Sequence, residues 1–259
     1  MDFEGYHEGN SIIHRIDPRV RVLITLVFSF LTAILINFNA LFLSLTISLL
    51  LVISANLNII KVSKNLKAFT GFIILIWIIL PLSIKGETLY KLWFLNFSTE
   101  GIELALRITL KSFSIILLFN ALISTMNFSV LGSSMESLKV PLKIVYLFLM
   151  TFRYISVLDE EYKRLMQAAK IRGFKAGVNL HTYKTYGNIL GMLFVNAHER
   201  GNRVYKAMVC RGFNGKFYSL QNFKISFKDF IFASMMVLLI SAVLTLEYSG
   251  ILLKIQKVI

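Results

Sequence analysis

The chain has 259 residues, of which 56% are hydrophobic and 16% charged, and its formal net charge is +14. This apolar share excludes an ordinary soluble domain, so we predict an integral membrane protein. The charge alone would also suit a nucleic-acid-binding protein, but the sequence contains no RNA- or DNA-binding motif, and we expect no nucleic acid as a partner. One cysteine excludes an intramolecular disulfide, and four scattered histidines without zinc-ligand spacing predict no metal site.

The N-terminal half contains four apolar segments that we predict to be transmembrane helices, at residues 19–36, 40–57, 68–84 and about 102–126. Cations flank both ends of the hairpin formed by the first two segments, and its turn is uncharged. The positive-inside rule therefore places the N-terminus in the cytoplasm. Arg107 and Lys111 lie near the start of the fourth segment. They either reach toward the outer headgroups, with Glu103 paired to Arg107, or form a polar track that faces another subunit.

The composition changes between residues 127 and 228, where sixteen Lys and Arg stand against five Asp and Glu, a net charge of +11. We predict a cytoplasmic region with two long amphipathic helices, at residues 141–172, with Pro141 in the first turn, and at about 188–211. Residues 141–158 are apolar enough to leave a sixth crossing open, although Lys143 and Arg153 lie within them. A last transmembrane helix is expected at residues 229–250.

These segments predict an all-α polytopic membrane protein with about five transmembrane helices and a cytoplasmic pair of amphipathic coupling helices. Its expected parts are an N-terminal membrane bundle of four spans at residues 1–126, a coupling-helix region at 127–228, and a C-terminal transmembrane helix with its tail at 229–259. The expected location is the cell membrane, crossed several times.

One motif occurs twice in the basic region, at a spacing of 39 residues. Each copy reads E-x3-R-x3-A-x3-R-G-F, and in a helix these four-residue steps place the Glu, Arg, Ala and Arg on one stripe. The first copy consists of Glu160, Arg164, Ala168, Arg172, Gly173 and Phe174, and the second of Glu199, Arg203, Ala207, Arg211, Gly212 and Phe213. Two copies are too few for a solenoid, so we interpret them as a duplicated contact element.

Each copy ends in an Arg-Gly pair, which predicts the end of a helix. Glycine suits a left-handed C-terminal cap, and the preceding cation complements the helix dipole. A small alanine one turn earlier lets a partner backbone approach closely, while an arginine at the tip can form a forked hydrogen bond with a carboxylate. We therefore expect two helix tips that each enter a socket on a partner.

The sequence resembles the transmembrane T components of energy-coupling factor (ECF) transporters over nearly its whole length. The resemblance is carried by AAKIRGF (168–174), AMVCRGF (207–213) and HRIDPRVRVL (14–23). Within that family, MTFRYISVLDEE (150–161), GNILGMLF (187–194) and RVYKAMVCRGFNGK (203–216) are most similar to the CbiQ branch, which serves cobalt or nickel uptake. The first Arg-Gly element departs from the family pattern only at Lys170 and Ile171.

This resemblance implies a subunit without catalytic residues, metal or nucleotide of its own. The two tips would dock into two ABC-type ATPase subunits, which carry the ATP, while the membrane helices hold a substrate-capturing membrane subunit. Arg172 and Arg211 would make the principal contacts, with Ala168, Gly173, Ala207 and Gly212 permitting close approach. Glu160, Arg164, Glu199 and Arg203 would form the supporting stripe.

Three other functions are compatible with parts of the sequence. A T component of a vitamin transporter would share every motif and differ in cargo. A membrane-embedded enzyme would have to use His14, His181 or His198, but no H-E-x-x-H or G-x-S-x-G motif accompanies them. A basic anchor for anionic lipid would account for the charge and leave the duplicated motif unexplained.

Overall fold

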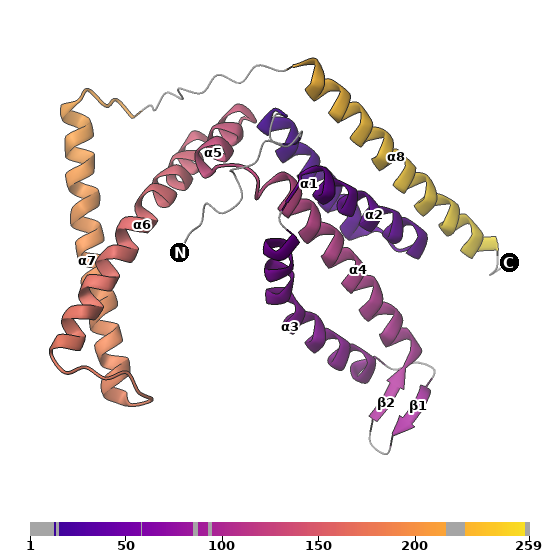
Figure 1. Ribbon diagram of the computed structural model, residues 1–259, viewed down its shortest axis with the longest axis horizontal. Coiled ribbons are helices and arrows are strands. Elements are labelled where there is room, and N and C mark those ends of the chain that lie inside the picture. Colours follow the sequence, from indigo (N-terminus) through magenta and orange to yellow (C-terminus); the bar gives the residue numbers. More distant parts are fainter. Residues whose placement is uncertain are drawn as a thin grey trace. The chain divides into compact units, whose positions relative to one another are not determined.

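The computed structural model describes residues 13, 16–57, 59–84, 88–92, 95–215 and 226–256, and this part of the chain is helical apart from one short β-hairpin (Figure 1). The helices are α1 (Pro18–Ile34), α2 (Phe38–Ser54), α3 (Ile59–Ser83), α4 (Thr99–Leu122), α5 (Phe128–Ser137), α6 (Leu142–Ile171), α7 (Leu180–Cys210) and α8 (Phe227–Gln256). Strands β1 (Thr88–Leu92) and β2 (Leu95–Ser98) pair antiparallel between α3 and α4. The all-α class is confirmed, and the hairpin is an addition that the sequence did not predict.

The chain divides into two compact units, one formed by Met1–Ser134 with Phe223–Ile259 and the other by Met135–Asn222. In the first unit, α4 packs against α1, α2 and α3, while α8 packs against α1 and α2. In the second unit, α6 packs against α7. We predicted boundaries at residues 126 and 228 from the expected side of the membrane. The two units are defined by contacts within the chain, so they do not test these boundaries, which stay a prediction.

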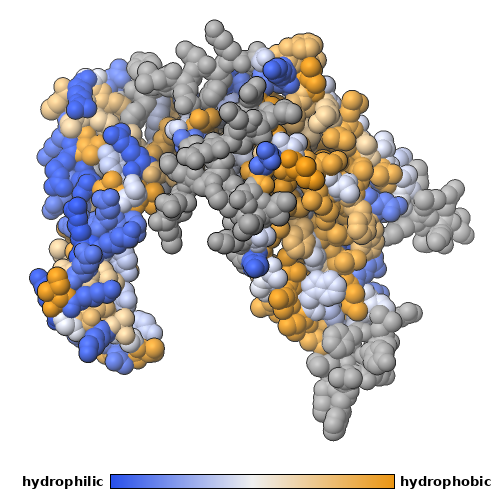
Figure 2. All heavy atoms as spheres, viewed as in Figure 1, coloured by the Kyte–Doolittle hydropathy of each residue, from blue (hydrophilic) through white to orange (hydrophobic). Residues whose placement is uncertain are grey.

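The first unit is apolar both inside and outside. Its core includes Phe28, Leu41, Leu118 and Met236, all at most 2% exposed. Large apolar side chains also cover its outer surface, which is mainly orange in Figure 2. Helices that are apolar all round are typical of a membrane bundle, because lipid then solvates the outer side chains.

Each of the five predicted transmembrane segments coincides with a helix. Only one of these helices is, over its described residues, both long enough and apolar enough to cross a membrane. Among the described residues, that helix is α8, over Phe227–Gly250. Helix α2 and the Phe69–Ser83 part of α3 are apolar but shorter. Helix α1 has only 17 residues and carries two arginines in its first turn. Helix α4 contains three charged residues, Glu103, Arg107 and Lys111, which lower its hydropathy. The total of five spans therefore stays a prediction.

The two long helices of the second unit were predicted with one error in their bounds. Helix α6 occupies the expected residues, with Pro141 at its N-cap position rather than inside its first turn. Helix α7 begins at Leu180, eight residues before the expected start. The polar residues in the first two turns of α7 and its interior Gly187 concealed this start, because the helix propensity of the segment is weak.

Candidate functional site

Both copies of the duplicated motif end in the same cap geometry. Gly173 and Gly212 have φ angles of +83° and +82°, in the left-handed region. At the first tip, the Gly173 N–H donates to the Lys170 carbonyl at 3.0 Å and the Phe174 N–H to the Ala169 carbonyl at 3.1 Å. These two bonds define a Schellman motif, and glycine is favoured because its φ angle carries no Cβ penalty.

The second tip repeats this arrangement bond for bond. The Gly212 N–H donates to the Val209 carbonyl at 2.9 Å and the Phe213 N–H to the Met208 carbonyl at 3.0 Å. Arg172 and Arg211 are the C-cap residues of α6 and α7, so each guanidinium extends from the last turn of its helix. The predicted left-handed caps are confirmed at both positions.

The motif side chains are accessible along both helices. Every stripe position is exposed, namely Glu160, Arg164, Ala168 and Arg172 on α6 and Glu199, Arg203, Ala207 and Arg211 on α7. Each stripe lies on its own helix, as the four-residue spacing predicted. Figure 2 shows that the visible surface of α6 and α7 is mostly hydrophilic, in contrast to the bundle helices.

Ion pairs at i, i+4 spacing differ between the two copies. On α7, Arg203 and Glu199 lie 3.7 Å apart, both well exposed, whereas on α6 the paired residues are Lys163 and Asp159, at 2.7 Å. The hydrogen bond from Lys163 lowers the pKa of Asp159 and raises the pKa of Lys163, so both groups stay ionised at neutral pH. Exposed pairs of this kind contribute little stability, and the stripe remains available to a partner.

The first tip lies beside the first third of α7, and the second tip lies at the C-terminal end of that helix. Helix α7 has 31 residues, begins eight residues after Arg172 and ends immediately before Arg211. Phe174 contacts Tyr186, so about 25 residues of α7, or about 38 Å at about 1.5 Å per residue, separate the two tips. Helices α6 and α7 cross, as Figure 1 shows, and the Asn196 amide donates to the Glu161 carboxylate across the crossing at 2.9 Å. The structure therefore keeps the two copies apart.

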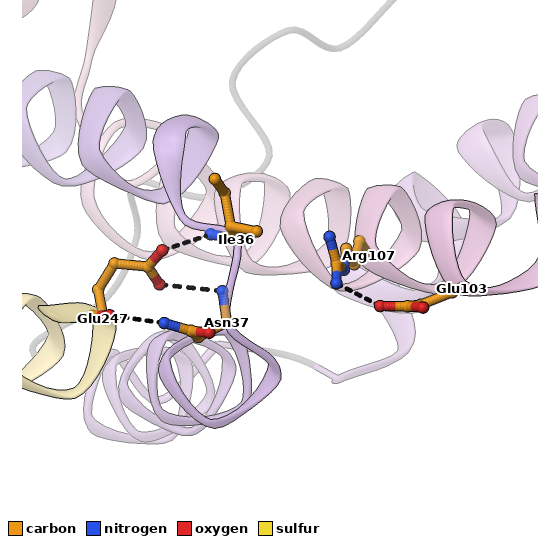
Figure 3. A network of polar contacts seen from close by, with 5 residues as sticks. All are labelled: Ile36, Asn37, Glu103, Arg107 and Glu247. Carbon is orange, nitrogen blue, oxygen red and sulfur yellow. Dashed lines mark hydrogen bonds and ion pairs between the residues drawn. The ribbon is translucent and has the colours of Figure 1, made fainter. Parts of the chain in front are cut away.

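The first unit contains polar contacts that sequence analysis did not foresee. Glu247 of α8 accepts hydrogen bonds from the backbone N–H groups of Ile36 and Asn37, at 2.9 and 3.0 Å, in the turn between α1 and α2 (Figure 3). The Asn37 side chain donates back to the Glu247 carbonyl at 2.6 Å. Glu247 is the only charged residue between Asp229 and Lys254 in the sequence. An isolated charge in an apolar helix indicates a specific polar partner, and this was the signal from which the contact could have been predicted.

The start of α8 is held in the same manner. Asp229, 2% exposed, accepts from the Ser226 N–H at 2.6 Å and from the Asp17 N–H at 2.7 Å. Asp17 in turn caps α1 by accepting from the Arg19 N–H at 2.9 Å. Carboxylates are favourable at helix N-termini. Asp229 therefore attaches α8 to the start of α1, and Glu247 attaches it to the start of α2. His14 and Arg15 of the HRIDPRVRVL motif lie outside the described residues.

The two cations of α4 are held within the bundle. Arg107 pairs with Glu103 (Figure 3), as the first interpretation predicted, and it also lies over the Phe38 ring at 5.0 Å from its centroid. Lys111 donates to the Ala33 carbonyl in the last turn of α1, at 2.7 Å. A cation there compensates carbonyls that the end of a helix leaves unpaired. Within the described ranges, no group of three or more His, Cys, Asp or Glu side chains is arranged to hold a metal ion.

Comparisons with known proteins agree with the resemblance inferred from the motifs. The family model CbiQ, described as a cobalt transport protein, matches residues 9–221. Proteins named energy-coupling factor transporter transmembrane protein EcfT are similar throughout much of their length. The protein from Ruminiclostridium cellulolyticum is 26% identical, covering 81% of this chain and 82% of its own. The one from Brevibacillus brevis is 28% identical, covering 91% and 94%.

The family match extends across both units and includes both copies of the Arg-Gly motif. It confirms the predicted resemblance and supports a transport protein rather than an enzyme. Because the matching model spans well over half of the sequence, the chain belongs to the CbiQ family of membrane transport proteins.

Proposed function

We propose that this chain is the T subunit of an ECF-type ABC importer and transmits ATP-driven movement of two ATPase subunits to a substrate-capturing membrane subunit. The observation that carries the proposal is the duplicated tip. Two identical Schellman caps, each preceded by an exposed arginine, lie beside the first third of α7 and at its C-terminal end. Two equivalent tips about 38 Å apart suit two separate sockets, one on each of two partner subunits.

The chemistry of the tips favours protein sockets that contain carboxylates. Arg172 and Arg211 are exposed at the ends of their helices, and a guanidinium can form two parallel hydrogen bonds with one carboxylate. Ala168 and Ala207, one turn earlier, leave room for a partner backbone. ATP would be bound by the two ATPases, and this chain would hold neither nucleotide nor metal.

The first unit would be the membrane-embedded part and would hold the capture subunit. We place its N-terminus in the cytoplasm and expect α1, α2, α3, α4 and α8 to cross the membrane of the cell, with the second unit cytoplasmic. The attachment of α8 to α1 and α2 supports a single bundle. Asp229 and Glu247 provide that attachment at the two ends of α8.

We propose cobalt or nickel as the cargo, and the description of the matching family as a cobalt transport protein supports this choice. The cargo would be selected by the capture subunit. A vitamin is the second candidate, because the names of the EcfT relatives specify no substrate. Uptake of labelled cobalt and nickel by cells that carry the complete transporter, compared with uptake of labelled vitamins, distinguishes the two.

The test of the docking role is alanine substitution at the tips. Arg172→Ala and Arg211→Ala should each weaken ATPase binding by tenfold or more, since a buried interface arginine typically contributes about 2 kcal/mol or more. The assay measures how much ATPase is recovered with the tagged T subunit, and it also measures uptake of the cargo by the complete transporter. Arg153→Ala removes an exposed α6 cation away from the tips and should leave both unchanged. Normal ATPase recovery and uptake by the double tip variant would refute the proposal.

A further inference from the structure

The two tips have the same cap but different surroundings. Beside the first tip, between α6 and α7, lies a hollow of about 570 Å³. Its lining includes the apolar residues Leu165, Ala169, Ile189 and Met192 and the polar residues Arg172 and His181. This volume falls in the range of about 300–1,000 Å³ that is typical of ligand sites, and several side chains would fit.

The hollow exists because of small residues on α6 and the fold of the chain after the tip. Ala169 lines it where a larger side chain would project into it. Phe174 contacts Tyr186 of α7 edge-on, with ring centroids 5.6 Å apart, so the chain that leaves the first tip is held against α7. In the second copy, Met208 occupies the position of Ala169, and residues 211–215, the described part after that tip, contain no helix.

The charge around the hollow selects an anionic occupant. Residues 164–198, which include the whole lining of the hollow, contain five Lys and Arg and no Asp or Glu. Arg172 and His181 both line the hollow and are exposed. Among the described residues, the Arg172 guanidinium forms no hydrogen bond or ion pair, so it is available to a carboxylate.

We infer that this hollow receives a short acidic segment of one ATPase subunit, an inference that rests on the proposed function. The first tip would then dock through its arginine and through the hollow, whereas the second tip would dock through its arginine alone. The two ATPase contacts of this chain are therefore unequal. A protein segment is favoured over a lipid headgroup because the site is concave with an apolar lining, and a basic surface alone suffices for anionic lipid.

Filling the hollow tests the inference. Ala169→Phe projects a ring into the hollow, and Ala169→Met gives the first copy the residue of the second. Val195→Phe adds the same ring at an exposed α7 position that lies outside the hollow and is the matched control. The ATPase that is recovered with the tagged T subunit is measured without nucleotide. Ala169→Phe should lower ATPase recovery by about half, because one of the two contacts weakens, with a smaller loss for Ala169→Met and none for Val195→Phe.

A second pair of variants changes the charge at exposed positions instead of filling the hollow. His181→Glu places a negative charge in the lining at an exposed position and should reproduce the loss. His198→Glu makes the same change at an exposed α7 position that does not line the hollow, and should have no effect.

The outcomes separate this inference from the docking role of the tips. Suppose that Ala169→Phe and His181→Glu recover all of the ATPase, whereas Arg172→Ala and Arg211→Ala recover less. The hollow would then not be a docking site, and the docking role of the tip arginines would stand. Full recovery in all four variants would overturn both. If Ala169→Phe lowered binding to phosphatidylglycerol vesicles while ATPase recovery stayed complete, the occupant would be a lipid and the inference would be wrong.

Discussion

The left-handed glycine at the first tip gives a graded test of the docking geometry. Gly173 has a φ angle of +83°, and an added Cβ would meet no atom within 4 Å, so the cost of substitution lies in the backbone. A residue with a Cβ pays about 1–2 kcal/mol in this region, asparagine less, and a β-branched residue more. A cost of about 1–2 kcal/mol shifts the balance toward a frayed tip by a factor of 5–30.

We therefore expect Gly173→Asn to behave nearly as wild type, Gly173→Ala to be impaired and Gly173→Val to be impaired most. Hydrogen exchange at the amides of Gly173 and Phe174 reports the cap directly, because both donate to α6 carbonyls. ATPase recovery with the tagged subunit should fall in the same order. Gly177→Ala is the matched control, since its φ angle is not positive and the added Cβ would make an ordinary contact, 3.6 Å from the Asn179 amide.

Two results would refute this reasoning. If the asparagine variant were as impaired as the valine variant, side-chain size rather than the left-handed backbone would govern the tip. If exchange accelerated in the expected order while ATPase recovery stayed complete, the tip would not need to be formed before it docks.

Two further predictions concern the membrane bundle. Gly101→Ala would place a Cβ 2.7 Å from the Leu80 carbonyl oxygen and the Pro81 Cα, so we expect a loss of about 1–3 kcal/mol and a lower melting temperature in detergent, whereas Gly71→Ala, with open space around it, should melt as wild type. Glu247→Ala leaves the N–H groups of Ile36 and Asn37 without their acceptor, which should cost about 1.5–3 kcal/mol and accelerate exchange at both amides. Unchanged exchange in that variant would contradict the proposed attachment of α8.

The sequence predicted the tips well because their signals are local. Gly173 and Gly212 follow an arginine at the end of a stripe with four-residue spacing, and both the cap and the exposure of the stripe depend on a few neighbouring residues. The β-hairpin between α3 and α4 was missed, as was the early start of α7 at Leu180. In the segment 180–187 the large side chains Leu180 and Tyr183 are 87% and 65% exposed, so no buried apolar stripe marks the start of the helix, and Gly187 and the polar residues lower its helix propensity.

Contacts between distant segments could not be predicted from periodicity. The Glu247 carboxylate reaches a turn about two hundred residues earlier, at Asn37, and nothing in either segment specifies the other. The hollow beside Arg172 likewise depends on how α7 crosses α6. Small residues such as Ala169 indicate only that space is available, and the neighbouring helix decides whether that space becomes a site.

The crossing of α6 and α7 gives the proposed mechanism a pivot. A hydrogen bond joins Asn196 to Glu161 at the crossing, while two hollows between the same helices, of about 570 and 150 Å³, show that the helices separate elsewhere. Phe174 also contacts Tyr186 beside the first tip, so a force on the second tip would be carried to the crossing through α7. An acidic segment in the larger hollow would wedge the helices apart on one side. In the proposed transporter, one ATPase would thereby set the angle and the other would act on the far end of α7.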